Sequence, residues 1–296
     1  MHVPVLPAEV CALLQPERGG LFVDCTVGLG GHARLLLEGG ATRLIGVDRD
    51  TDALDLARAA LAPWKERVEL VHADYRDLGA VLDARGVTVV AGVLADLGVS
   101  SMQLDGEGRG FSFKRDEPLD MRMDRTQGAT AAQRLEDVDE AALADIIYQF
   151  GEERRSRQVA HAIVLARRAG PIQTTGRLAE IVRRGVAARG WQRIDPATRT
   201  FQALRIWVND ELAGLDAFLT TAAAARLAPG GRLAVISFHS LEDRVAKHTL
   251  RGLTRGEGAR LRLLTKHPVV AGDAEAAANP RARSAKLRAA EALPVD

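Results

Sequence analysis

The chain has 296 residues, of which 47% are hydrophobic and only 4% aromatic, so it can bury a large core built mainly on Ala, Leu and Val. A formal net charge of +1 does not by itself indicate a nucleic-acid-binding protein, but it does not exclude one, since local patches matter more than totals. The two cysteines form neither a disulfide framework nor a zinc set, no apolar run is long enough to span a bilayer, and the N-terminal segment lacks a signal-peptide pattern. We therefore expect a soluble, cytoplasmic protein with no resident metal and no membrane contact.

The stretch from Leu21 to His32 predicts a ligand-binding turn. Leu21–Val23 is a short apolar run, typical of a buried strand. Gly28, Gly30 and Gly31 follow, and a helix begins near residue 33. A strand, a glycine turn and a helix N-terminus together form a nucleotide-type cradle.

Three interpretations fit this turn. The pattern Gly28-x-Gly30-x-x-Ala33 matches the dinucleotide fingerprint. The same stretch resembles the first motif of S-adenosylmethionine (SAM) methyltransferases, in which an acid, here Asp24, stands four residues before the first glycine. An ordinary glycine-rich turn is the third interpretation, so the later segments must decide.

The second and third predicted strands each lead to an acid. Asp48 ends the strand at 43–48, about 20 residues past the glycines, the spacing expected for a carboxylate that binds ribose hydroxyls. Asp74 and Tyr75 follow the strand at 68–71 and resemble an adenine pocket. A turn aspartate and a half-buried tyrosine explain that pair equally well, so it stays open.

A fourth predicted strand, at 87–97, contains Asp96 near its carboxyl end, and Ser100 follows it closely. Ligands of open parallel sheets bind beyond the carboxyl ends of the strands. A functional role is therefore favoured for Asp96 over a purely structural one.

The pattern then changes to helices. Residues 106–198 contain helical periods at 131–135, 140–148, 152–168 and 175–188, with no strand pattern between them. Arginines recur there and could follow RNA phosphates, although most helical charges are simply solvated. We expect an all-helical domain inserted into one α/β domain made of residues 1–105 and 199–296.

Strands resume towards the C-terminus. A long helix is predicted from Gln202 to about Leu227, followed by a glycine stop and a fifth strand at 232–238 that leads to His239. Residues 260–265 predict an edge strand, and the tail at 279–288 is basic and predicted to be only partly ordered. The fold class expected is α/β, with the Rossmann-like sheet of a class I SAM-dependent methyltransferase.

The cofactor choice favours SAM over NAD. Only two tyrosines occur and no Tyr-x-x-x-Lys pair is present, so the acid–base set of a nicotinamide dehydrogenase is missing. If the methyl acceptor is the exocyclic amine of a base, groups that accept its N–H hydrogens would favour the localised lone pair of the transition state. Asp96 is such an acceptor, Ser100 is an adjustable partner, and His239 could orient the amine or a phosphate.

The chain resembles the bacterial small-subunit ribosomal RNA cytidine N4-methyltransferases, the MraW-type (RsmH-type) family, over nearly its whole length. The shared motifs are D-C-T-V-G-L-G-G-H at 24–32, D-L-G-V-S-S-M-Q-L-D at 96–105, R-G-F-S-F at 109–113, P-L-D-M-R-M-D at 118–124, G-E-E-R at 151–154, P-A-T-R-T-F-Q-A-L-R-I at 196–206, S-F-H-S-L-E-D-R at 237–244 and N-P-R-A-R-S at 279–284. The sequence departs from the family at Ala33, where a serine is expected, which puts at most one hydrogen bond in doubt.

The resemblance implies a substrate, a cofactor and a set of residues. The substrate would be one cytidine in the decoding region of 16S ribosomal RNA, conventionally C1402, methylated on N4, with the 30S subunit as partner and the insertion as RNA-recognition domain. The residues that would hold SAM are Gly30, Gly31, His32, Asp48, Tyr75, Asp96 and Gln103. Asp96, Ser100 and His239 are the catalytic candidates.

Two other functions remain as alternatives. A non-catalytic ribosomal-RNA-binding assembly factor could use the same fold, and the glycine fingerprint alone would also suit an NAD-dependent oxidoreductase. The oligomeric state is left open, with a homodimer as one candidate.

Overall fold

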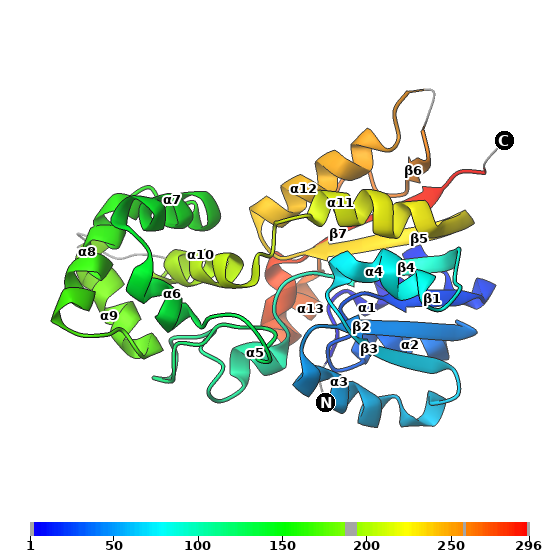
Figure 1. Ribbon diagram of the computed structural model, residues 1–296. Coiled ribbons are helices and arrows are strands. Elements are labelled where there is room, and N and C mark those ends of the chain that lie inside the picture. Colours follow the sequence, from blue (N-terminus) through cyan, green and yellow to red (C-terminus); the bar gives the residue numbers. More distant parts are fainter. Residues whose placement is uncertain (1–2, 187–193, 257–258, 295–296) are drawn as a thin grey trace. The chain divides into compact units, whose positions relative to one another are not determined.

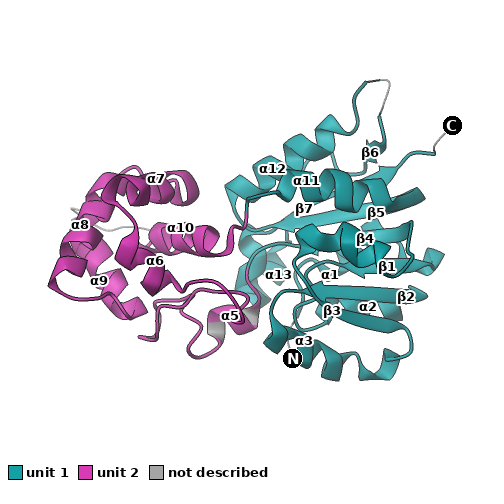
Figure 2. Cartoon of the chain, in the orientation of Figure 1, with its two compact units in different colours: residues 1–98, 212–296 teal, residues 99–211 magenta. Residues whose placement is uncertain are grey.

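The computed structural model describes residues 3–186, 194–256 and 259–294 (Figure 1). These residues form two compact units (Figure 2). The first unit comprises residues 1–98 and 212–296, and the second comprises residues 99–211. The second unit is therefore wider at both ends than the insertion of 106–198 expected from the sequence.

A seven-stranded sheet forms the first unit, in the order β3-β2-β1-β4-β5-β7-β6. The strands are β1 (Leu21–Asp24), β2 (Arg43–Asp48), β3 (Val68–His72), β4 (Val90–Asp96), β5 (Leu227–Ser237), β6 (Leu261–Leu263) and β7 (Lys286–Ala292). The first five pair in parallel, whereas β7 pairs antiparallel with both β5 and β6. The α/β fold class with a Rossmann-like sheet is confirmed, and the edge strand predicted at 260–265 is confirmed as β6.

Helices cover both faces of this sheet, because consecutive strand residues point to opposite faces. The helices of this unit are α1 (Pro7–Leu14), α2 (Gly31–Glu38), α3 (Thr51–Ala60), α4 (Leu78–Asp83), α11 (Leu215–Ala217), α12 (Ser240–Gly252) and α13 (Asp273–Ala278). Phe22 of β1 lies in a core shared with α1, α2 and α3. Its neighbour Val23 lies in the other core, with α4 and α12. The carboxyl ends of the parallel strands therefore stay free to present side chains.

Two predictions for the C-terminal part are wrong. The long helix expected over 202–227 is interrupted, because α10 (Ala197–Asn209) ends at Asp210 in the left-handed conformation, with φ 49°. The tail at 279–288, expected to be only partly ordered, forms a 3-10 helix at Pro280–Ser284 and the start of β7, a largely buried strand between β5 and β6. Ala290 and Ala292, further along β7, lie in the core that also holds residues of α4 and α12.

The second unit is helical and has its own core. Its helices are α5 (Ser101–Asp105), α6 (Ala131–Asp137), α7 (Glu140–Gly151), α8 (Ser156–Ala169), α9 (Thr175–Val186) and α10. Leu143, Ile147, Val159, Ile163 and Leu204 are buried against one another in this core. The helical periods predicted from residue 131 are confirmed up to Val186, within a few residues at each end, and residues 187 and 188 lie outside the described ranges.

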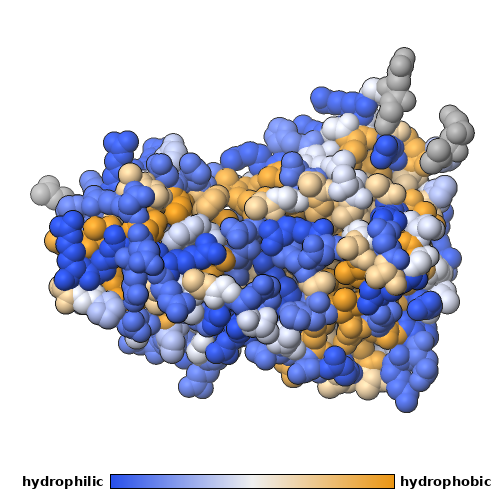
Figure 3. Space-filling view, viewed as in Figure 1, coloured by the Kyte–Doolittle hydropathy of each residue, from blue (hydrophilic) through white to orange (hydrophobic). Residues whose placement is uncertain are grey.

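No helix in the described ranges is both long enough and apolar enough to cross a membrane. Hydrophilic side chains, shown in blue, cover much of the face drawn in Figure 3, with hydrophobic patches between them.

Candidate functional site

The glycine turn between β1 and α2 is tied to the end of β2. Gly28 and Gly30 adopt left-handed conformations, with φ of 51° and 80°, which residues with a Cβ rarely occupy. The backbone N–H of Gly28 donates to Oδ2 of Asp48 at 2.8 Å, and the N–H of Asp50 donates to Oδ1 at 2.9 Å. Asp48 therefore shapes the turn as well as offering its remaining lone pairs.

Burial raises the pKa of Asp48 to about 6, although the two backbone N–H groups act in the opposite direction. Gly31, the first residue of α2, is helical, and a Cβ there would touch only the ring of Pro4, at 3.4 Å. The backbone of this turn can therefore approach a ligand closely, as the sequence predicts.

Two buried polar side chains and a partly buried one lie beside the turn. Asp24 ends β1, His32 stands in the first turn of α2, and Asp96 ends β4. The Nε2 atom of His32 is 3.6 Å from Oδ2 of Asp96. Within the described part of the chain, Asp24 Oδ2, Asp96 Oδ1 and both ring nitrogens of His32 are buried without a hydrogen-bond partner. Such orphaned atoms are costly in a folded protein and point to a ligand or a catalytic role.

The charges of these groups are coupled. Burial raises the pKa of Asp24 to about 7, with only partial compensation by the neighbouring His32 and the N–H of Thr26. Burial alone would lower the pKa of His32, but the nearby carboxylates of Asp96 and Asp24 outweigh it, so that the pKa is raised. This part of the site favours a ligand that carries positive charge and N–H groups.

These residues fit SAM. Its sulfonium and ammonium groups are cationic, and the orphaned carboxylate oxygens of Asp24 and Asp96 are free to accept its hydrogens or to compensate its charge. Gly28 and Gly31 of the glycine turn are partly exposed, and Asp48 ends the neighbouring strand, where a ribose is bound in sheets of this kind.

Asp74 and Tyr75, which follow β3, differ in what their side chains contact. Tyr75 is buried, with its ring edge-on to Phe218 at a centroid distance of 4.7 Å. Both carboxylate oxygens of Asp74 accept from the guanidinium of Arg76, at 2.8 and 2.7 Å, and Arg49 lies 3.4 Å away. Although burial opposes it, these cations lower the pKa of Asp74. The Asp74 carboxylate is therefore already engaged and is a poorer adenine acceptor than the sequence suggests.

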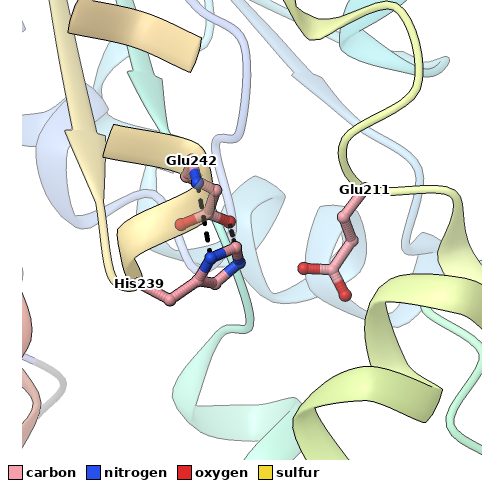
Figure 4. Close-up of side chains that lie close together, drawn as sticks. All are labelled: Glu211, His239 and Glu242. Carbon is pink, nitrogen blue, oxygen red and sulfur yellow. Dashed lines mark hydrogen bonds and ion pairs between the residues drawn. The ribbon is translucent and has the colours of Figure 1, made fainter. Parts of the chain in front are cut away.

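His239 lies at the carboxyl end of β5 and caps α12 (Figure 4). Its Nδ1 accepts from the backbone N–H of Glu242 at 3.4 Å, and its Nε2 lies 3.1 Å from Oε1 of Glu242 without the alignment of a hydrogen bond. The other oxygen of Glu242 accepts from the backbone N–H of Phe238 at 2.9 Å. The sequence analysis did not single out Glu242, although a buried acid three residues after His239 in the first turn of a helix is a recognisable signal.

Ser100 and Gln103 belong to the second unit. The hydroxyl of Ser100 accepts from the N–H of Gln103 at 3.2 Å, and the Gln103 side chain accepts from the N–H of Ser100 at 2.9 Å. This is a reciprocal capping box at the start of α5, and the sequence pattern Ser-x-x-Gln predicts it. It holds both candidate side chains in defined positions.

Many arginines of the second unit are engaged within that unit. Arg183 pairs with Asp195 at 2.8 Å, and Arg177 and Arg184 both pair with Glu180. Others donate to backbone carbonyls, among them Arg155 to Val186 and Arg167 to Leu135 and Val138. Arg154, Arg157 and Arg168 are exposed. Fewer arginines of the second unit are therefore available to bind phosphates than the sequence suggests.

Comparison with known proteins adds to this geometry. A family model described as the MraW methylase family matches residues 1–293. "Ribosomal RNA small subunit methyltransferase H" of Sorangium cellulosum is 53% identical over 289 residues, covering 98% of this chain and 90% of the relative. The protein of the same name from Nitrobacter hamburgensis is 54% identical over 304 residues, with 98% and 90% coverage.

Among solved structures, a SAM-dependent O-methyltransferase from Thermotoga maritima aligns over 100% of this chain and 69% of its own, with a TM-score of 0.41 and 10% identity. The family match spans almost every residue, and it includes the glycine turn and the carboxyl ends of β1, β2 and β4. The chain therefore belongs to the MraW methylase family.

Proposed function

We propose that this protein transfers a methyl group from SAM to the exocyclic N4 of a single cytidine, conventionally C1402, in the decoding region of 16S ribosomal RNA. The small-subunit ribosomal RNA methyltransferases that it resembles support the substrate class. The observation that carries the chemistry is the buried, unpartnered Oδ1 of Asp96 at the carboxyl end of β4, next to the glycine turn. Membership of a methylase family removes the support for an NAD-dependent oxidoreductase.

The cofactor would be held mainly by the first unit. Gly30 and Gly31 supply a close backbone approach, and Asp48 supplies lone pairs for ribose hydroxyls. His32, Tyr75 and Asp96 would complete this part of the site, and Gln103 is the remaining residue that the family resemblance assigns to SAM binding. SAM supplies an already activated methyl group, so the protein needs to orient the acceptor amine rather than to activate the donor.

The catalytic roles follow from the need to localise a lone pair. The nitrogen of a cytosine amine shares its lone pair with the ring, and an acceptor for its N–H favours the localised form needed in the transition state. Asp96 would be that acceptor and could take the proton released from the amine. The Ser100 hydroxyl, which can donate or accept, would hydrogen-bond to the amine or to its base. His239, held by Glu242, would orient the nucleotide from the end of β5.

The helical second unit would recognise RNA, and the assembled 30S subunit would be the partner. A base within a structured RNA must leave its stack before its amine reaches such a site. A catalytically silent assembly factor is the remaining alternative, and it predicts normal ribosome maturation without methyl transfer.

The test is methyl transfer from labelled SAM to 30S subunits that lack this modification, followed by mapping of the product nucleotide. We expect one methyl group on N4 of C1402, and a loss of rate of about 100-fold or more in Asp96→Asn, because the neutral amide cannot take the proton that the amine releases. Asp55→Asn, on an exposed side chain of α3, is the matched control and should keep full activity. Absence of transfer by a protein that binds SAM would reject the substrate.

A further inference from the structure

The outer face of α12 is basic. Arg244, Lys247, His248 and Arg251 occupy positions i, i+3, i+4 and i+7 of this helix, which places them on one side. The opposite side packs inward through Glu242, Asp243, Ala246 and Leu250. Arg244, His248 and Arg251 are exposed, and Lys247 is partly so. We call these four residues the α12 basic face.

The acids of the helix do not pair with Lys247 and Arg251, the two central cations of this face. Asp243 is turned inward, where it accepts from Arg288 at 2.7 Å and from Lys286 at 3.3 Å. Among the residues that the structure describes, no ion pair is formed by Lys247 or Arg251. Like charges four residues apart destabilise a helix, so the side chains of Lys247 and Arg251 repel each other.

This face differs from the arginines of α9. Arg177, Arg183 and Arg184 all lie on that helix and form ion pairs with Glu180 or Asp195. A phosphate must compete with those carboxylates, whereas Lys247 and Arg251 would lose only water. The free positive charge is therefore more concentrated on α12 than on α9.

The position of the helix connects this face to the reaction. The helix starts immediately after His239, at the carboxyl end of β5, which is the ligand edge of the sheet. From Arg244 to Arg251 the face extends about 10 Å along the helix axis. Arg255 and Arg260, which follow the helix in the sequence, are also exposed.

We propose that the α12 basic face binds the phosphate backbone of ribosomal RNA beside the target nucleotide. The inference rests on the proposed function and adds a binding surface on the catalytic unit. Lys and Arg contribute to RNA binding through charge and counterion release, so this contact would position the RNA without reading its sequence.

The experiment compares two double variants with the same loss of charge. Lys247→Gln with Arg251→Gln removes the central cations of the face. Lys65→Gln with Arg58→Gln removes one lysine and one arginine from exposed positions, 78% and 64% accessible, on and after α3. Affinity for unmethylated 30S subunits is measured at several salt concentrations, together with kcat, KM for the subunit and Kd for SAM.

The α12 variant should bind 30S subunits about tenfold more weakly than the control, and the slope of log affinity against log salt should become shallower by about 1.4, as expected for two lost phosphate contacts. KM should rise with kcat and the Kd for SAM little changed, and Lys247→Arg with Arg251→Lys should restore binding. Equal KM and equal slopes in the α12 and control variants would overturn the inference. A wild-type protein that transfers no methyl group to 16S RNA would instead overturn the proposed function.

Discussion

At the scale of single residues, Asp24 is the most informative side chain. It is 1% exposed, and its Oδ2 has no hydrogen-bond partner in the described chain. Burial raises its pKa to about 7, against 3.8 for an ordinary aspartate. The folded protein therefore binds more protons than the unfolded chain between these values, and stability decreases as the pH rises from about 4 to about 7.

Asp24→Asn should remove the part of this pH dependence that comes from Asp24. The amide keeps the oxygen that accepts from the N–H of Thr26 and never ionises. At pH 8 we expect the variant without cofactor to be more stable than the wild type by about 2 to 4 kcal/mol, and at pH 4 the two should be nearly equal. Thermal unfolding at both pH values measures this. The same difference at both values would contradict it, whereas weaker binding of SAM by the variant would support a role in holding a cation.

Local sequence patterns predict some residues of the site but not others. The positions of Asp48 and the glycines follow from their spacing, because the glycine turn follows β1 and Asp48 ends β2, the adjacent parallel strand. The engagement of Asp74 by Arg49 and Arg76 could not, since a side-chain ion pair leaves no fixed spacing in the sequence.

At the scale of elements, the neighbouring Gly30 and Gly31 of the glycine turn differ in whether their backbone conformation requires glycine. Gly30 has φ 80°, and a Cβ there would lie 3.1 Å from Cγ of Leu61. Gly31 is helical, and its Cβ would meet only Pro4 at ordinary contact distance. The left-handed conformation therefore demands glycine at the first position only.

Gly30→Ala should destabilise the protein by about 1 to 2 kcal/mol through backbone strain, and more if Leu61 cannot move. Gly31→Ala should be neutral, or stabilising by a few tenths of a kcal/mol, because alanine favours a helix. Chemical denaturation without SAM measures folding separately from cofactor binding. Equal losses in the two variants would show that backbone conformation is not what requires glycine at position 30.

At the scale of the whole molecule, the C-terminal segment completes the sheet of the first unit. Strand β7 lies between β5 and β6, and its Arg288 forms a buried ion pair with Asp243 of α12 at 2.7 Å. Although burial opposes it, the cations of Arg288 and Lys286 lower the pKa of Asp243. The pair thus joins the last strand to the helix that follows the candidate reaction edge.

Arg288→Met should destabilise the protein by about 3 kcal/mol, because it leaves Asp243 with only the half-exposed Lys286 as partner. The double variant with Asp243→Asn should recover a large part of that loss, since no buried charge remains. Arg262→Met is the control: its partner Glu291 is shared with Arg232 and its side chain is 64% exposed, so a loss below about 1 kcal/mol is expected. Urea denaturation compares these variants with Asp243→Asn alone, and a double variant whose loss equals the sum of its two single losses would contradict the prediction.

The sequence by itself determined the alternation of strands and helices, the helical periods after residue 131, the glycine turn and the acids that end β2 and β4. These features depend on neighbours within a few residues or on apolar periodicity, so they leave local patterns. Only the tertiary structure decided the place of β7 in the sheet, the end of α10 at Asp210 and the approach of His32 to Asp96. Pairing between distant segments and the burial of side chains are set by packing free energy, which no local pattern encodes.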